Sequence, residues 1–300
     1  MAIIYRPALS DDLESAARIV QQAYNDLRVR HGLAPMVPLR PPLFQRFCLA
    51  EAQDGLWVAE EDDAIVGFGF SWMCQKFWFL AQLFIKPGTQ ASGLGRTLLS
   101  KTLEQAHRNG ADNRALITLA YNPVSIGLYV RNGLYPREPL YRVAAPASVV
   151  EQNITTTGHD AVPIAPWPEP QQWIGKIDEE VLGIRRDSHH RFLRSDFPAR
   201  AVKIERAGRP VGYAYVSPER HIGPLEVAPD ADRKAVVATA IGCALEQQPE
   251  QLSMIVPGRA DQILDAVSVF GFRIDEPYVL LSAWPFGDWR NYMPSNPGYM

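Results

Sequence analysis

A loop between an apolar strand and a helix has the residue types of an anion-binding site. The segment reads Leu83-Phe-Ile-Lys-Pro-Gly-Thr-Gln90-Ala-Ser-Gly93-Leu-Gly95-Arg96 and leads into a helical pattern. A helix start presents free backbone N–H groups and a positive dipole end, and glycine lets an anion approach the backbone. Since the dipole contributes only about 0.3 to 2 kcal/mol, several converging amides must hold the anion, with Arg96 as a charged donor. The sequence thus predicts a phosphate-type ligand here.

Two common nucleotide-binding loops do not fit this segment. A Walker A loop needs G-x-x-x-x-G-K-[ST]; Gly88 and Gly93 have that spacing, but Leu94 stands at the lysine position. A Rossmann fingerprint needs a third glycine, where this chain has Leu98, within a parallel strand–helix–strand unit. The preceding strands follow one another over short links that favour antiparallel pairing. Binding of ATP, GTP or a dinucleotide is therefore disfavoured.

A second chemical element follows the next predicted strand. Asn122 is followed by Tyr129 seven residues later and then by Gly-Leu, with Leu134 last. Together with Gln-Ala-Ser-Gly-Leu-Gly at residues 90–95, this pattern resembles the GNAT N-acetyltransferase family. That family has a pyrophosphate loop Q/R-x-x-G-x-G/A after a strand, then Asn, Tyr and Gly-Phe at this spacing, so Leu134 is a conservative departure. The resemblance covers about residues 3–144.

The resemblance implies an acetyl-CoA cofactor and a set of residues that hold it. In this family the strand before the loop separates from its neighbour, and its exposed backbone pairs with the pantetheine arm. The loop amides bind the pyrophosphate, Asn122 lies near the pantetheine, and Tyr129 is the catalytic residue that points at the thioester sulfur. The implied cofactor-binding residues are Leu83, Phe84, Ile85, Gln90, Ala91, Ser92, Gly93, Leu94, Gly95, Arg96 and Asn122.

The implied reaction is transfer of an acetyl group from acetyl-CoA to an amine by direct attack on the thioester. Backbone amides would stabilise the oxyanion, and CoA would leave as a thiolate. Because a thiol has a pKa of about 8.5 and a tyrosine of about 10, full proton transfer from Tyr129 is uphill by about 2 kcal/mol, which favours a hydrogen bond to the departing sulfur. Many relatives carry a glutamate about eleven residues before the glutamine, but residues 77–80 are Phe-Trp-Phe-Leu. The sequence shows no general base, and the acceptor is left open as a small-molecule or peptide amine.

Each of these residues also has a purely structural interpretation. Gln90 and Arg96 fit a solvated loop, Asn122 fits a helix cap before a proline, and Tyr129 fits the core side of a helix. The aromatic residues between positions 68 and 79 fit an acceptor pocket or simply the core. The alternative function, from a different class, is a non-catalytic acyl-CoA-binding or sensor protein. Retention of the tyrosine favours the enzyme.

The elements that must position these residues alternate between strands and helices. Hydrophobic periodicity predicts strands over residues 3–6, 56–60, 64–72, 77–86, 115–120 and 140–144. It predicts helices over residues 42–52, 93–109 and 124–132, and a first helix capped by Asp11 with Glu14 completing a capping box. The fold class is α/β (α+β): two GNAT-like domains, each a mixed, mostly antiparallel sheet flanked by helices.

The second half of the chain repeats the first. Val211-Gly-Tyr-Ala-Tyr echoes Val66-Gly-Phe-Gly-Phe, and Phe270-Gly-Phe echoes Asn132-Gly-Leu, each at the end of a helical pattern. A threonine- and proline-rich linker lies between about residues 145 and 170. We therefore predict an acetyl-CoA-binding GNAT domain over residues 1–146 and a degenerate GNAT-like domain over residues 147–300. The alternative is two unrelated α/β domains with common strand and helix patterns.

The second half lacks both chemical elements of the first. Its loop carries Asp230 and Asp232 where the first half has a glycine and a glutamine, and Ala260 and Val267 replace the Asn and Tyr. Carboxylates repel a pyrophosphate, so we expect one acetyl-CoA per chain. This half also resembles the C-terminal domain of some tandem GNAT proteins, through Leu-Gly-Ile-Arg-Arg at residues 182–186 and Ile-Gly-Pro-Leu at residues 222–225.

Composition excludes several other classes of function. The 300 residues, 47% hydrophobic and 21% charged, are typical of a globular chain with two domains. A net charge of −3 gives no basic surface for nucleic acid. No apolar window reaches the length of a membrane span and no leader precedes the first strand, so we expect a cytoplasmic protein that contacts no membrane. The sequence does not indicate an oligomeric state.

A metal site is not expected either. The three cysteines are far apart and odd in number, which builds neither a disulfide framework nor a local zinc site. His189 and His190 are adjacent on a predicted helix, point in different directions, and have no carboxylate or cysteine cluster nearby in the sequence. We expect this pair to be solvated or to lie between the domains.

Overall fold

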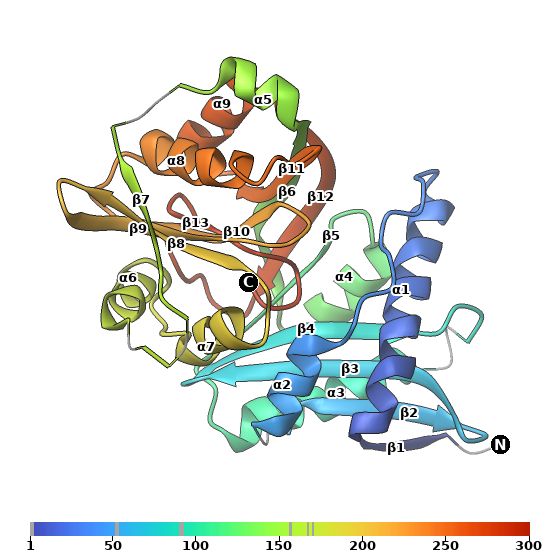
Figure 1. Ribbon diagram of the computed structural model, residues 1–300. Coiled ribbons are helices and arrows are strands. Elements are labelled where there is room, and N and C mark those ends of the chain that lie inside the picture. The colour runs from blue at the N-terminus through green and yellow to red at the C-terminus, as the bar shows by residue number, and fades with distance from the viewer. Residues whose placement is uncertain (1–2, 52–53, 90–92, 156–157, 167, 170) are drawn as a thin grey trace. The chain divides into compact units, whose positions relative to one another are not determined.

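The chain forms two compact units, each with its own helices, and the strands that the structure describes follow one continuous order of pairing (Figure 1). The computed structural model describes residues 3–51, 54–89, 93–155, 158–166, 168–169 and 171–300. Unit 1 comprises Met1–Leu116 and Gly127–Asn132, and unit 2 comprises Ile117–Ile126 and Gly133–Met300. The division therefore falls within β5 (Asn113–Leu119) and within α4 (Pro123–Val130).

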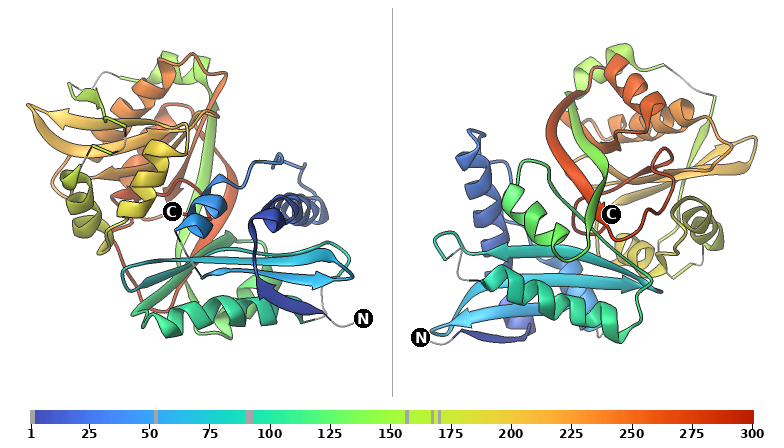
Figure 2. Two further views of the ribbon diagram at one scale, coloured as in Figure 1. Left: turned by 60° about the horizontal axis from the view of Figure 1, so that its bottom comes forward. Right: turned by 180° about the vertical axis from the view of Figure 1, so that it is seen from behind.

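Unit 1 is a sheet with helices on both faces. The strands pair in the order β1–β2–β3–β4–β5, and all pairings are antiparallel except that of β4 with β5. Figure 2 shows α3 on the face opposite α1 and α2. The elements are β1 (Ile4–Pro7), α1 (Leu13–Arg30), α2 (Leu43–Ala50), β2 (Leu56–Glu61), β3 (Ala64–Cys74), β4 (Phe77–Ile85) and α3 (Leu94–Arg108).

The central strands of unit 1 bury their aromatic side chains. Trp72 stacks on Phe79 with ring centroids 4.9 Å apart, and Phe44 of α2 packs on Phe70 at 5.7 Å. The indole of Trp78 donates to the backbone oxygen of Thr102 at 3.1 Å. All the aromatic residues from position 68 to position 79 are at most 3% exposed. These side chains form the core, so the pocket interpretation of them was wrong.

Unit 2 holds the remaining strands of this sheet, also with helices on both faces. Its strands pair in the order β12–β6–β11–β10–β9–β8–β7; β10 and β11 are parallel and the other pairs are antiparallel. In Figure 1, α8 and α9 cover one face of this sheet and α6 and α7 the other. The elements are β6 (Tyr135–Pro146), α5 (Ala147–Asn153), β7 (Asp160–Pro163), α6 (Gln172–Leu182), α7 (Asp187–Ser195), β8 (Arg200–Arg206), β9 (Arg209–Val216), β10 (His221–Val227), α8 (Arg233–Leu245), β11 (Gln251–Pro257), α9 (Asp261–Val269), β12 (Arg273–Ser282) and β13 (Tyr292–Met293).

The same succession of elements occurs twice along the chain. The order β1-α1-α2-β2-β3-β4-α3-β5-α4-β6 is followed, after α5, by β7-α6-α7-β8-β9-β10-α8-β11-α9-β12. The predicted fold class, mixed and mostly antiparallel strands flanked by helices in each half, is confirmed, but the strands follow one continuous order in which β5 neighbours β12. The predicted boundary at residue 146 follows this repeat, whereas the compact units divide elsewhere, because β6 pairs with β11 and β12 of unit 2. Domains 1–146 and 147–300 remain a prediction about the repeat.

The start of the first helix differs from its prediction. Ser10–Asp12 form a short 3-10 turn, and α1 begins at Leu13 instead of being capped by Asp11. The Asp12 carboxylate accepts from the Leu9 backbone N–H at 2.7 Å and from Arg6 of β1 at 2.6 Å. The hydrogen bond from Arg6 lowers the pKa of this carboxyl. The ion pair with Arg6 therefore favours Asp12 over Asp11 as the residue that bonds the backbone before α1. The local sequence pattern could not indicate this, because Arg6 lies on a neighbouring strand.

Candidate functional site

One edge of β4 loses its partner strand halfway along. Parallel pairing with β5 joins Phe77–Leu80 to Asn113–Leu116 and stops there. On its other edge β4 stays paired with β3 as far as Ile85. Within the described part of unit 1, residues 83–85 therefore present backbone groups that no ladder pairing uses on the β5 side. This is the separated strand that the resemblance predicts.

The side chains of this strand hold it in place and leave its backbone edge available. Leu83 and Ile85 pack against a buried cluster that includes Leu94 and Leu98 of α3. Phe84 points to the opposite face, because successive side chains of a strand alternate. The strand is thereby fixed on the helix whose first turn follows it in the sequence.

The first turn of α3 is open above its backbone. The helix begins at Leu94, and its N-cap, Gly93, has φ 83° and makes no side-chain capping bond. Among the described residues, a Cβ at Gly93 would have nothing within 4 Å, and one at Gly95 would meet Ile85 and Leu128, both at 3.9 Å. The Arg96 side chain is exposed. Glycine is required at Gly93 by its left-handed backbone, and its missing side chain leaves room for an anion.

Three predicted loop residues, Gln90, Ala91 and Ser92, lie outside the described residues. Their predicted contacts with the pyrophosphate stay predictions.

Tyr129 lies in unit 1 together with the loop. It is buried on α4, and its neighbour Leu128 is the residue that approaches Gly95 of α3. The backbone oxygen of Tyr129 accepts from Asn132 at 2.9 Å, which closes the helix. The structure thus brings the helix of the predicted catalytic tyrosine to the first turn of α3.

Asn122 lies in unit 2 and caps α4. Its Oδ1 accepts from the Ser125 backbone N–H at 3.2 Å, and its Nδ2 donates to the Ser125 hydroxyl at 2.8 Å. This is the structural role that its position before Pro123 predicts. A second role beside the pantetheine stays a prediction.

A buried carboxylate next to this cap was not singled out from the sequence. Tyr121 donates from its hydroxyl to Glu276 of β12 at 2.6 Å, and Glu276 is fully buried at a bulge of that strand. Glu276 follows the exposed residues Arg273, Ile274 and Asp275, and its burial depends on the bulge of β12, which a local sequence pattern does not reveal.

The loop of unit 2 that corresponds to the candidate site is shorter and is capped by its own side chain. It runs over residues 228–232 between β10 and α8, whereas residues 86–93 join β4 to α3. The Asp232 carboxylate accepts from the Ala235 backbone N–H at 3.1 Å at the start of α8. The amide that a phosphate would approach is therefore already bonded to a carboxylate.

A network of charged and phenolic side chains fills the interior of unit 2. Arg186 donates to Asp178 at 3.0 and 3.1 Å, to Tyr213 at 2.7 Å and to Tyr292 at 2.6 Å. The Tyr213 hydroxyl lies 2.6 Å from Asp178 and 2.5 Å from Glu226. None of these five side chains is measurably exposed. Asp178 lies in the apolar stripe of α6, and this misplaced charge is the sequence signal that could have revealed the network.

The two histidines after Arg186 belong to the same interior. His190 lies 3.1 Å from Asp178 and 2.9 Å from the hydroxyl of Tyr215, and His189 is also buried. Both side chains are buried, so the expectation that the pair is solvated was wrong. His190 is held by its contacts with Asp178 and Tyr215 within unit 2.

The environment sets opposite protonation states on the two carboxyls of this network. Burial alone would raise the pKa of Asp178, but the charge of Arg186 holds it well below its usual range. Burial and the neighbouring Asp178 raise the pKa of Glu226 well above its usual range. Asp178 is therefore the counter-ion of Arg186, and the site favours the neutral form of Glu226 beside it.

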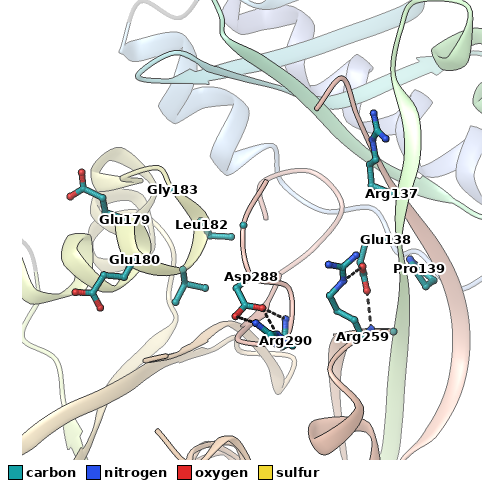
Figure 3. Close-up of a pocket in the computed structure, with 13 residues that line it drawn as sticks. Arg137, Glu138, Pro139, Glu179, Glu180, Leu182, Gly183, Arg259, Asp288 and Arg290 are labelled. Atoms are coloured by element: carbon teal, nitrogen blue, oxygen red, sulfur yellow. Dashed lines mark hydrogen bonds and ion pairs between the residues drawn. The ribbon is translucent and has the colours of Figure 1, made fainter. Parts of the chain in front are cut away.

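A cavity of about 890 Å³ opens on unit 2 (Figure 3). It lies between the end of α6, the start of β6 and the segment that precedes β13. Two of the arginines that line the cavity are paired with carboxylates, Arg259 with Glu138 at 2.5 Å and Arg290 with Asp288 at 2.8 Å. Arg137 donates to the backbone oxygen of Ala283 at 2.8 Å. The cavity contains none of the predicted site residues.

Two further kinds of site were sought in the part of the chain that the structure describes. No group of three or more His, Cys, Asp or Glu side chains there is placed to hold a metal ion. None of the helices in those residues has the length and apolar character of a membrane span.

Comparisons with known proteins agree with this architecture. Residues 20–134 match the family model described as "Acetyltransferase (GNAT) family". No curated protein matches the sequence.

The solved structures extend the likeness to the whole chain. A putative acetyltransferase from Pyrococcus horikoshii is 18% identical with a TM-score of 0.76, over 99% of this chain and 96% of that one. A GCN5-related N-acetyltransferase from Sphaerobacter thermophilus is 14% identical with a TM-score of 0.64, over 95% and 97%. A tandem GNAT protein from the clavulanic acid biosynthesis pathway is 14% identical with a TM-score of 0.62, over 95% and 99%. The resemblance to the GNAT acetyltransferases is therefore confirmed, by the family match in the first half and by the fold over the whole chain.

Proposed function

We propose that the chain is an N-acetyltransferase that binds acetyl-CoA in unit 1 and transfers the acetyl group to an amine. The observation that carries the proposal is that a strand edge open at residues 83–85 is followed in the sequence by the start of α3, which no side chain of the described residues caps. A strand edge suits the amide groups of a pantetheine arm, and a glycine-flanked helix start suits a pyrophosphate. One ligand class, a CoA thioester, contains both groups in sequence.

The residues of unit 1 have distinct roles in this proposal. Backbone groups of Leu83, Phe84 and Ile85 pair with the pantetheine. The amides from Gln90 to Gly95, with the Arg96 guanidinium, hold the pyrophosphate.

The tyrosine acts on the leaving group. The Tyr129 hydroxyl donates a hydrogen bond to the sulfur as the acceptor amine attacks the thioester carbon and the carbon–sulfur bond breaks. A positioned acid of this kind contributes about 10²- to 10⁴-fold to the rate. The acceptor amine supplies the proton that ends on the thiol or in solvent.

Release of free thiol tests the function directly. The full chain is incubated with acetyl-CoA and a panel of small amines and peptides with free amino groups. Thiol release that requires both an amine and the protein supports the proposal. Binding of acetyl-CoA without thiol release from any acceptor would favour the acyl-CoA-binding or sensor alternative.

A further inference from the structure

The strand of unit 2 that corresponds to β4 also loses its parallel partner, but another strand takes the place. β10 pairs in parallel with β11 only at His221 and Ile222, and a bulge follows before Leu225. Beyond the bulge, Leu225 and Glu226 pair antiparallel with Met293 and Tyr292 of β13. The edge that is open at residues 83–85 of unit 1 is therefore occupied in unit 2.

The occupying segment follows β10 closely on both sides of this pair. The Val227 backbone N–H donates to the Asn291 oxygen at 2.8 Å. A Cβ on Gly223 would lie 2.9 Å from the backbone oxygen of Pro294 and from Cα of Ser295. The backbone of residues 291–295 thus runs along β10 from its end to its bulge.

Side chains on both sides anchor this segment. The Tyr292 hydroxyl accepts from Arg186 at 2.6 Å, and the guanidinium carbon lies 4.8 Å from the centre of its ring. Arg233 in the first turn of α8 donates to the Asn291 side chain. Asn291, Tyr292 and Met293 have no exposed surface. Tyr292 is therefore held by the buried charge network, and Asn291 is held by the first turn of α8, the helix that corresponds to α3.

We propose that unit 2 is a strand-binding site whose ligand is this chain's own segment, residues 291–293, held in the slot that unit 1 uses for the pantetheine arm. The statement that unit 1 uses the corresponding strand edge for a pantetheine arm rests on the proposed function. The statement that residues 291–293 occupy the edge of β10 rests on their strand pairing and on the contacts of Tyr292 with Arg186 and of Asn291 with Arg233. Together with the carboxylate cap of Asp232 on α8, the segment closes unit 2 to acetyl-CoA.

Hydrogen exchange of the full chain, followed by mass spectrometry of proteolytic fragments, tests the inference. Two fragments matter: one that covers residues 82–88 and one that covers residues 222–228. In the unmodified chain, saturating acetyl-CoA slows exchange of the first fragment and leaves the second, already slow, unchanged. Slowing of the second fragment by acetyl-CoA would overturn the inference.

Loosening the segment tests the cause. Tyr292→Ala removes the ring and the bond to Arg186, and exchange of fragment 222–228 should become about tenfold faster or more, because local opening controls it. Tyr278→Ala, which removes a buried tyrosine from β12, is the matched control and should leave that fragment unchanged. Equal exchange in the two variants would overturn the inference.

The outcomes separate the two proposals. If acetyl-CoA slows neither fragment, the proposed function of unit 1 fails, while the Tyr292→Ala result still decides whether the segment closes the slot. If Tyr292→Ala does not fold, Asn291→Ala, which removes only the bond from Arg233, replaces it with a smaller expected increase at the same fragment. If exchange of fragment 222–228 in Asn291→Ala is as slow as in the unmodified chain, the inference is overturned.

Discussion

The guanidinium of Arg186 lies over the ring of Tyr292 and donates to its hydroxyl at 2.6 Å. This contact joins a buried cation, which follows α6, to the short strand that fills the slot beside β10. Unit 1 has no counterpart at the corresponding position, where Phe84 stands in place of Glu226 and the strand edge is open in the described residues. The two halves share a succession of elements but differ in what occupies their equivalent slots.

Gly93→Val should abolish measurable binding of acetyl-CoA. The side chain would enter the open space above the first turn of α3, where the pyrophosphate is proposed to bind. Gly110→Val is the matched control, because Gly110 follows the other end of the same helix, also has a positive φ and also has open space around a Cβ. Calorimetry with both variants separates the effect of filling the site from the effect of backbone strain. If Gly93→Val and Gly110→Val bind acetyl-CoA with equal affinity, the loop before α3 is not the pyrophosphate site.

Tyr129→Phe should lower kcat by about 10²-fold or more and change the affinity for acetyl-CoA little, because the hydroxyl acts mainly on the leaving sulfur. Steady-state kinetics with the best acceptor from the amine panel measures both quantities. Tyr5→Phe, on β1 of the same unit, is a control that should leave both unchanged. An unaltered kcat in Tyr129→Phe would exclude the tyrosine from the mechanism.

Arg186→Met should lower the free energy of unfolding by about 3 to 5 kcal/mol, since it leaves the Asp178 carboxylate buried without its counter-ion. Urea unfolding measures the loss. Arg185→Met removes the adjacent arginine, which pairs with Asp187 at the surface, and should cost far less. Similar losses in the two variants would show that the buried network contributes no more than a surface ion pair.

His189 should make stability fall as the pH drops below about 6.5, the pKa of an unfolded histidine. Burial, and then the charge of Arg186, lower the folded pKa of His189 well below this value. Between the two pKa values the unfolded chain binds one more proton than the folded chain, so the free energy of unfolding decreases by up to about 1.4 kcal/mol per pH unit. In His189→Gln this component is absent. Parallel stability curves for the two proteins from pH 7.5 to 5 would contradict the prediction.

Much of the fold could be predicted because its elements have clear periodicity. Strands β2, β3 and β4 and helix α3 lie within two residues of their predicted bounds. Their alternating or helical apolar pattern is a local property that packing does not override. The loop that ends at Gly93 could also be found, since a short motif with two glycines between a strand and a helix is visible in the sequence.

The closing segment and the buried network could not be predicted in the same way. β13 is two residues long and lies in a stretch with prolines and glycines, so it has no periodicity, and only its pairing with β10 makes it a strand. Arginine usually faces water, and the burial of Arg186 depends on Asp178 and Glu226, which lie on other elements. Asn122 had two interpretations in the sequence, and the structure establishes the cap.

The most direct test of the account is the stoichiometry of acetyl-CoA binding to the full chain by isothermal titration calorimetry. We expect one site per chain, lost in Gly93→Val, because unit 1 has an open strand edge and unit 2 holds its own segment in the corresponding place. Two sites per chain would show that unit 2 accepts the cofactor despite that segment. No binding at all would contradict the assignment of unit 1.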